Sequence, residues 1–156
     1  ILQGVETLSL RVQRQSATAL TIARWLEQHP GVGSVDYSGL ESSPHHALAQ
    51  RYLPHGQGSV FAVTLHGGRE AARAFTDALR LFTRMTHLGD VRSLVLHPAT
   101  TTHVLRDDEQ LAARGIGPGL LRLSIGLEDA DDLIADLDHA LAAAAAADLL
   151  STVGAS

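Results

Sequence analysis

Apolar residues recur at helical spacing along several segments of the chain, which predicts a set of amphipathic helices. Residues 5–29 carry apolar side chains three, four and seven positions apart, and Pro30 ends this helix because proline lacks an amide proton. Residues 69–82 form a second amphipathic helix, and 44–52 a shorter one that begins at a proline. Acidic residues near the helix start favour two more helices, over 107–114 and 129–147.

Four short apolar runs between these helices predict strands, over residues 32–37, 59–66, 91–96 and 120–125. The run 59–66 would be apolar on both faces of a strand, so we expect a central strand covered by helices. Helices and strands alternate along the chain, an order that fits both a parallel α/β fold and an α+β fold. The alanine-rich residues from 143 onward are expected to form a frayed tail.

Composition excludes several classes of protein. The 156 residues suffice for one domain, and 45% of them are hydrophobic. A net charge of −5 leaves no basic field for nucleic acid. With no cysteine, the chain has neither disulfides nor thiolate nucleophiles. Because no apolar run approaches the roughly 18 residues of a membrane span, we expect no membrane partner.

The basic residues are all of one kind: the chain has twelve arginines and no lysine. It therefore cannot form a lysine Schiff base. The N-terminus lacks a methionine, a basic region and a cleavage site, so it does not resemble a signal peptide. We expect the sequence to be a piece of a longer chain.

Nine histidines raise the possibility of a metal site, but their spacing favours scattered surface or capping residues. No His-Glu-x-x-His element is present, and His97 and His103 are six positions apart. A serine hydrolase is not favoured either, because Gly-x-Ser-x-Gly is absent. The glycine-rich run 115–119 precedes a strand, and Pro118 removes a donor, so we interpret it as a plain loop rather than a phosphate site.

Arg122 is the most informative single residue, because it interrupts an otherwise mostly apolar strand. It lies either on an exposed face or where it binds an anion, and its planar guanidinium matches a carboxylate with two hydrogen bonds. Residues 96–103 place three threonines between two histidines, which gives either a donor-rich loop or an ordinary polar turn.

Three motifs, in the right order, resemble the Cys/Met-metabolism family of pyridoxal-phosphate enzymes over about residues 1–142. Residues 4–11 (GVETLSLR) resemble the opening of its C-terminal domain. Gly89-Asp90 followed by 93–103 (SLVLHPATTTH) is similar to its central motif. Residues 121–129 (LRLSIGLED) followed by 131–134 (DDLI) resemble its C-terminal signature. The branch most similar to the chain is O-acetylhomoserine sulfhydrylase; methionine γ-lyase and cystathionine γ-synthase share much of the pattern.

The resemblance implies the small C-terminal domain of a fold-type I enzyme, and so favours α+β. It implies an antiparallel or mixed sheet of about four strands, helices on one face and a long N-terminal helix. We expect residues 1–142 to be this domain and 143–156 an alanine-rich tail. The implied reaction converts O-acetylhomoserine and sulfide to homocysteine and acetate, in methionine biosynthesis, with pyridoxal 5'-phosphate as the electron sink. The implied enzyme is cytoplasmic and homo-oligomeric, with a tetramer as the family expectation.

The resemblance also assigns roles to residues. Arg122 would anchor the substrate α-carboxylate. His87 stands where related lyases have a serine that helps to hold this carboxylate, and sulfhydrylases often an asparagine; neutral imidazole can still donate one hydrogen bond. Thr102 is a further candidate substrate contact. The Schiff-base lysine and phosphate-binding residues would lie outside this chain, so we expect the chain alone to bind no cofactor and to be inactive. The alternative of another class is a non-catalytic α+β binding or oligomerisation module.

Overall fold

The computed structural model describes residues 2–87, 89–98 and 116–153 and shows five strands and several helices. The helix predicted over 107–114 lies outside these residues. In chain order the described elements are α1 (Leu2–Glu6), α2 (Leu8–Glu27), β1 (Val32–Asp36), α3 (His46–Tyr52), β2 (Val60–Leu65), α4 (Gly68–Ala78), β3 (Thr83–Arg84), β4 (Leu94–Leu96), β5 (Leu120–Ser124) and α6 (Ala130–Val153).

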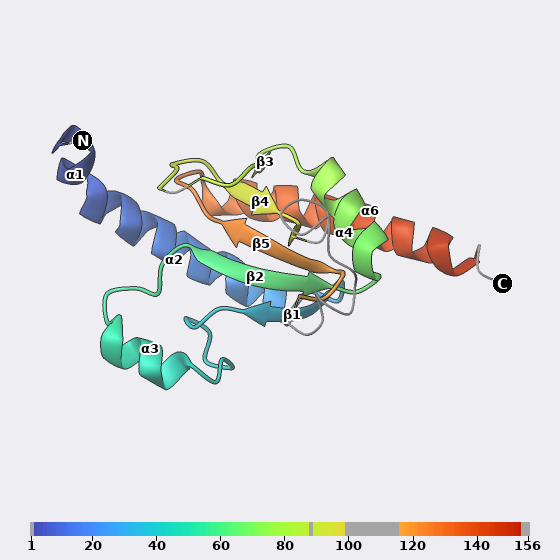
Figure 1. Ribbon diagram of the computed structural model, residues 1–156, viewed down its shortest axis with the longest axis horizontal. Helices are drawn as coiled ribbons and strands as arrows, with labels where there is room; N and C mark the ends of the chain where they lie inside the picture. Colours follow the sequence, from blue (N-terminus) through green and yellow to red (C-terminus); the bar gives the residue numbers. More distant parts are fainter. Residues whose placement is uncertain (1, 88, 99–115, 154–156) are drawn as a thin grey trace.

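The strands form one mixed sheet in the order β1-β2-β5-β4-β3 (Figure 1). The first three pairings along this order are antiparallel, and β3 joins β4 in parallel. The expected α+β class and mixed sheet are confirmed, whereas the expected count of about four strands misses β3. β3 is too short, at two residues, to show any periodicity in the sequence.

β3 exists because α4 ends at Ala78, before the predicted boundary at residue 82. The Asp136 carboxylate on α6 accepts hydrogen bonds from the backbone N–H groups of Arg80 (2.9 and 3.2 Å) and Leu81 (2.9 Å). These bonds satisfy backbone donors outside any helix and turn the chain toward the sheet edge. A buried carboxylate from a distant helix thus sets the end of α4, which local sequence cannot reveal.

The helices α2, α4 and α6 lie on one face of the sheet, and the hydrophobic core fills the space between (Figure 1). Alternate strand residues point into this core, including Phe61, Val63, Leu121 and Leu123, each at most 3% exposed. They pack with side chains from the three helices, such as Ile22, Leu26, Phe75, Leu133 and Leu137. The other face of the sheet, here called the open face, has no described helix over it.

This arrangement corrects the prediction that residues 59–66 form a strand covered by helices. β2 turns Phe61, Val63 and Leu65 toward the helices, but Val60 on the open face is 43% exposed. An open face lined by valine and alanine has the same sequence signature as a buried one. Apolar residues at alternate and intervening positions therefore do not show by themselves that helices cover both faces of a strand.

The other boundaries differ from the predictions at element ends. The single helix expected over 5–29 is divided at Thr7 into α1 and α2 (residues 8–27), and the first turns of α2 project beyond the sheet (Figure 1). The strand expected over 91–96 is paired only from Leu94. α6 continues through Val153, so most of the alanine-rich segment expected as a tail is helical. Alanine has the highest helix propensity, which explains the extension.

Among the described residues, no helix combines the length and the apolar character that a bilayer crossing requires.

Candidate functional site

Arg122 lies at the centre of the open face, where strand alternation places it. On β5, Leu121 and Leu123 point into the core, so Arg122 between them points to the opposite side. It pairs with Ala62 on β2 and with Leu96 on β4. Directly paired residues share a face, so the guanidinium stem is flanked by a methyl group and an isobutyl group. Neither neighbour can neutralise its charge.

A groove of about 500 Å³ runs along the open face beside Arg122. Its walls are mostly apolar, and Asp36 contributes the one carboxylate among the described lining residues. Asp36 is in the same row of the sheet as Ala62 and Arg122, two strands away from the arginine. Within the described part of the chain, no hydrogen bond or ion pair engages the Arg122 guanidinium. Its five N–H donors are therefore available to a ligand.

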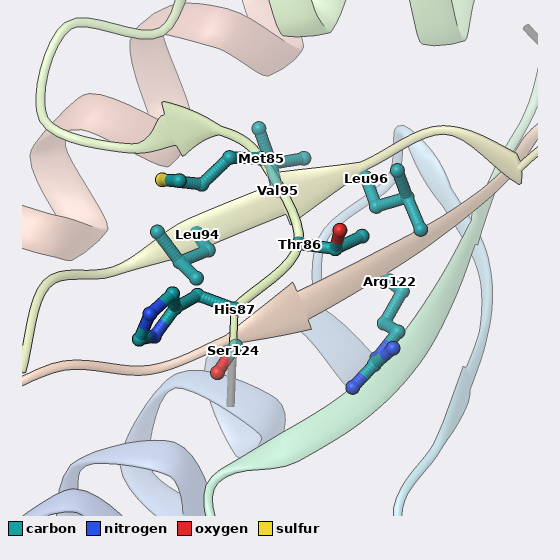
Figure 2. Close-up of a pocket in the computed structure, with 8 residues that line it drawn as sticks. All are labelled: Met85, Thr86, His87, Leu94, Val95, Leu96, Arg122 and Ser124. Atoms are coloured by element: carbon teal, nitrogen blue, oxygen red, sulfur yellow. The ribbon is translucent and has the colours of Figure 1, made fainter. Parts of the chain in front are cut away.

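The second side of the Arg122 environment is formed by the segment that follows β3. Met85, Thr86 and His87 line a depression together with Leu94, Leu96, Ser124 and Arg122. In Figure 2, His87 and Arg122 flank Ser124, which lies two residues after Arg122 on the same face of β5. The structure thus brings together Arg122 and His87, the two candidate residues that it describes.

His87 is oriented by an acidic neighbour. Its Nδ1 atom is 3.7 Å from Oδ2 of Asp90, whose side chain is only 8% exposed. Arg92 holds that carboxylate with two side-chain contacts, Nη2 to Oδ2 at 2.9 Å and Nε to Oδ1 at 3.1 Å, and with its backbone N–H. These hydrogen bonds from Arg92 hold the pKa of the Asp90 carboxyl well below its usual range. Asp90 is therefore an anion beside His87 at every physiological pH.

The segment that carries His87 and Asp90 is also attached to the long helix. Gln15 on α2, which is 8% exposed, donates from Nε2 to the backbone oxygen of Asp90 at 3.0 Å. Two separate elements therefore hold the Asp90 turn, α2 from the side and Arg92 from within the turn. A fixed turn reduces the freedom that His87 would lose on binding a ligand.

The third candidate residue, Thr102, lies outside the described residues, as do the other threonines of the polar loop. His97 at the start of that loop is 3% exposed, and its Nε2 lies 2.8 Å from the carbonyl oxygen of Pro118. Since a carbonyl can only accept, Nε2 carries the proton. Burial lowers the pKa of His97, so the ring is neutral at pH 7. His97 ties the end of β4 to the start of β5.

Several polar residues near Arg122 escaped the sequence reasoning. Thr86 and Ser124 border the depression, and Asp36 borders the groove. Ser124 could have been predicted from the sequence, because the two-residue repeat of a strand places it on the same face as Arg122. Asp36 and Thr86 come from strands and loops whose alignment with β5 depends on tertiary pairing, which leaves no local signal.

No group of three or more histidine, aspartate or glutamate side chains within the described residues is placed to bind a metal ion. The groove and the depression share the Arg122 guanidinium; aliphatic side chains and Asp36 line the groove, and the His87 imidazole lines the depression. A guanidinium beside aliphatic walls can bind a small anion with an apolar body.

Comparison with known proteins shows the family of the chain. Residues 1–142 match the family model of the Cys/Met metabolism PLP-dependent enzymes. The chain is 48% identical over 142 residues to O-succinylhomoserine sulfhydrylase of Pseudomonas aeruginosa, covering 91% of the chain and 35% of that protein. It is 46% identical over 143 residues to O-acetyl-L-homoserine sulfhydrylase of Leptospira meyeri, covering 90% of the chain and 32% of that protein.

Solved structures show the same fold. A Campylobacter jejuni protein named O-acetylhomoserine (thiol)-lyase, which contains N'-pyridoxyl-lysine-5'-monophosphate, matches with a TM-score of 0.84 and 39% identity over 90% of the chain and 34% of that protein. Cystathionine gamma synthase of Xanthomonas oryzae, in complex with cystathionine, matches with a TM-score of 0.85 and 45% identity over 94% of the chain and 38% of that protein. The chain spans about a third of the length of these relatives.

Proposed function

Because the chain belongs to the Cys/Met metabolism family of PLP-dependent enzymes, we propose that it forms the substrate-carboxylate-binding part of an O-acylhomoserine sulfhydrylase. The reaction we assign to the whole enzyme is the replacement of the acyl group by sulfide. For O-acetylhomoserine, the bond from the γ carbon to the ester oxygen breaks and a bond from that carbon to sulfur forms. Acetate leaves, and the product is homocysteine.

One observation carries this proposal: the guanidinium of Arg122 lies on the open face and has no hydrogen-bond or ion-pair partner among the described residues. A substrate α-carboxylate can accept two parallel hydrogen bonds from its planar fork. The neighbouring side chains at Ala62 and Leu96 bring no competing anion and exclude water from the sides of the pair. An ion pair with aliphatic neighbours is stronger than one in bulk water because the local dielectric constant is lower.

His87 provides a second, weaker contact to the same carboxylate. With Asp90 Oδ2 at 3.7 Å from Nδ1, the ring has a preferred orientation, and Nε2 is left for a ligand in the depression that His87 lines together with Arg122. A neutral imidazole with its proton on that nitrogen can donate one hydrogen bond.

The cofactor attachment does not fit this chain by itself. The family is PLP-dependent, and pyridoxal phosphate, when bound, supplies the electron sink for chemistry at the carbons of an amino-acid substrate. Its covalent attachment in the Campylobacter jejuni structure involves a lysine, and the present chain has none. We therefore propose that these residues hold and orient the substrate while residues elsewhere in the enzyme hold the cofactor, so that the chain alone has no turnover.

Apolar side chains on the helices support the proposal of subunit association. Leu2, Val5 and Leu10 on α1 and α2 are 81%, 58% and 66% exposed, along a part of the helices that projects beyond the sheet (Figure 1). Exposed apolar side chains grouped on one element are typical of an interface. Light scattering on the full-length enzyme tests the tetramer that the family resemblance implies.

The decisive experiment is an assay of the full-length enzyme with sulfide and either O-acetylhomoserine or O-succinylhomoserine, with homocysteine as the measured product. We expect homocysteine from at least one ester, and the ratio of the two kcat/KM values identifies the acyl group. Thiol release from methionine without homocysteine formation would make the enzyme a methionine γ-lyase. Cystathionine formation from cysteine in place of sulfide use would make it a cystathionine γ-synthase. No reaction with any of these substrates would overturn the assignment.

A further inference from the structure

A buried serine and a carboxylate link the two segments that carry Arg122 and His87. Ser93, which is fully buried, lies directly before β4, and Glu128 lies in the turn after β5. The Ser93 backbone N–H donates to Oε1 of Glu128 at 2.8 Å, and the Ser93 hydroxyl donates to Oε2 at 2.9 Å. One carboxylate therefore uses both oxygens on the amide and the hydroxyl of a single residue.

The same serine hydroxyl closes a small network. The Gly126 backbone N–H donates to Oγ of Ser93 at 2.9 Å, and the Leu127 N–H donates to the carbonyl oxygen of Val91 at 2.8 Å. Packing at Gly126 is so close that a Cβ atom there would lie 2.3 Å from Oε2 of Glu128 and 2.4 Å from the Val91 oxygen. The turn after β5 is thus held against residues 91–93 without space for adjustment.

Ser93 also determines where the His87 segment begins. Its backbone oxygen accepts a hydrogen bond from the Thr83 N–H at 2.9 Å, which places β3, and His87 follows β3 by three residues. Its neighbour Arg92 holds the Asp90 carboxylate, which lies beside His87. Hydrogen bonds of Ser93 and of its neighbour Arg92 therefore connect Glu128 to the segment that carries His87.

We propose that Ser93 and Glu128 are positioning residues that set the separation of His87 and Arg122, and thereby the fit of the groove to the substrate carboxylate. This inference rests on the proposed function, because it holds that the distance between His87 and Arg122 matters for binding the substrate carboxylate. Neither residue lines the groove or the depression beside Arg122, so their action on substrate is indirect. Strand pairing fixes Arg122 on β5, whereas His87 lies on a segment without strand pairing and depends on this network.

The test is a comparison of KM and kcat in the full-length enzyme for Ser93→Ala, Glu128→Ala and Glu128→Gln. Displacement of a binding group by an ångström weakens its contact strongly, so we expect the two alanine variants to raise KM for the acylhomoserine by about tenfold. KM for sulfide, which has no carboxylate, is expected to change less than about twofold. Glu128→Gln keeps the side-chain length and one acceptor, so it is expected to restore most of the affinity.

Tyr37→Phe is the matched control. Tyr37 is buried, and its hydroxyl donates a hydrogen bond to the carbonyl oxygen of Gly58 at 2.8 Å, outside the network that joins Glu128 to His87. It is expected to lower thermal stability while both KM values stay near those of the parent enzyme. If Glu128→Ala does not fold, Glu128→Asp, which retracts the carboxylate by one carbon, serves in its place.

Equal rises in both KM values, or the same kinetic changes in the Tyr37 control, would show that Ser93 and Glu128 act only on general stability and would overturn the inference. Unchanged KM in Ser93→Ala would do the same. These outcomes are distinct from failure of the proposed function, in which the parent enzyme itself would form no homocysteine.

Discussion

Arg122 and Asp36 lie in one row across the open face of the sheet, with Ala62 between them, and form no ion pair within the described part of the chain. Neighbouring strands are about 4.8 Å apart, so the two Cα atoms are separated by roughly 10 Å. The methyl group of Ala62 keeps the row open between the base and the acid. Arg122 therefore remains free for an anion from outside the domain.

Replacement of Arg122 is expected to give the largest kinetic effect. Arg122→Ala in the full-length enzyme removes two charge-assisted hydrogen bonds, and a loss of about 3 kcal/mol corresponds to a kcat/KM lower by roughly two orders of magnitude. Arg122→Lys keeps the positive charge but loses the planar pair of donors, so its kcat/KM is expected to lie between those of the parent enzyme and Arg122→Ala. Steady-state kinetics with an acylhomoserine checks this, and parental kcat/KM in both variants would remove Arg122 from the site.

A carboxylate introduced at Ala62 is expected to compete with the substrate. Ala62→Glu places an acid directly opposite Arg122, where an opposite-charge pair across strands stabilises the sheet by about 0.2–1 kcal/mol. KM for the acylhomoserine should then rise while the melting temperature stays the same or rises slightly. Ala62→Gln has nearly the same shape without the charge and is the control; an equal rise of KM in both variants would indicate steric blockage instead.

Substitution of His87 is expected to have a smaller effect than substitution of Arg122. His87→Ala removes one hydrogen-bond donor of the proposed carboxylate site, which corresponds to about 1 kcal/mol or a fivefold rise of KM. His87→Asn retains a donor and should recover part of this affinity. The measurement is KM at pH 7.5, and a His87→Ala enzyme with the parental KM would show that the imidazole does not contact the substrate.

The stability of the domain should fall below neutral pH through His97. Burial lowers the pKa of His97 in the folded chain, with Arg69 acting in the same direction and the hydrogen bond to Pro118 opposing it. The unfolded chain takes up a proton near the ordinary pKa of about 6.5. Between that pH and the lower folded pKa the unfolded state binds more protons, so the free energy of unfolding decreases as the pH falls.

His97→Gln isolates this contribution. The glutamine amide can still donate to the Pro118 carbonyl but does not titrate in this range. Urea unfolding at pH 7.5 and 5.5 is expected to show a smaller loss of stability in the variant than in the parent chain. The same loss in both proteins would contradict a contribution from His97.

Local patterns in the sequence were sufficient for most elements of the fold. β5 was predicted to within one residue because its apolar run is bounded by glycines. The pairing of β3 with β4 could not be predicted, since it depends on Asp136 of α6 capturing the backbone of Arg80 and Leu81. Such a contact joins residues about 55 positions apart and leaves no periodic signal.

The candidate site likewise contains residues that the sequence predicts and contacts that only the folded structure shows. Arg122 could be singled out because an arginine inside an apolar strand is unusual, and the family resemblance implied the role that we propose for it. His87 was found only by comparison with the family motif, and its proximity to Asp90 follows from a turn that the sequence does not display. The Ser93–Glu128 contact joins two motifs that are separate in the sequence, so neither motif reveals it alone.

The alternation of β5 has a consequence for how such domains diverge. Leu121 and Leu123 pack against the helices, whereas Leu120 and Arg122 line the groove and Ser124 lines the depression beside it. Mutational tolerance along this strand should therefore oscillate with a period of two, with loss of folding at odd positions and altered substrate preference at even ones. Natural variation can thus retune ligand choice one even-numbered position at a time, while the scaffold is inherited unchanged through the odd-numbered ones.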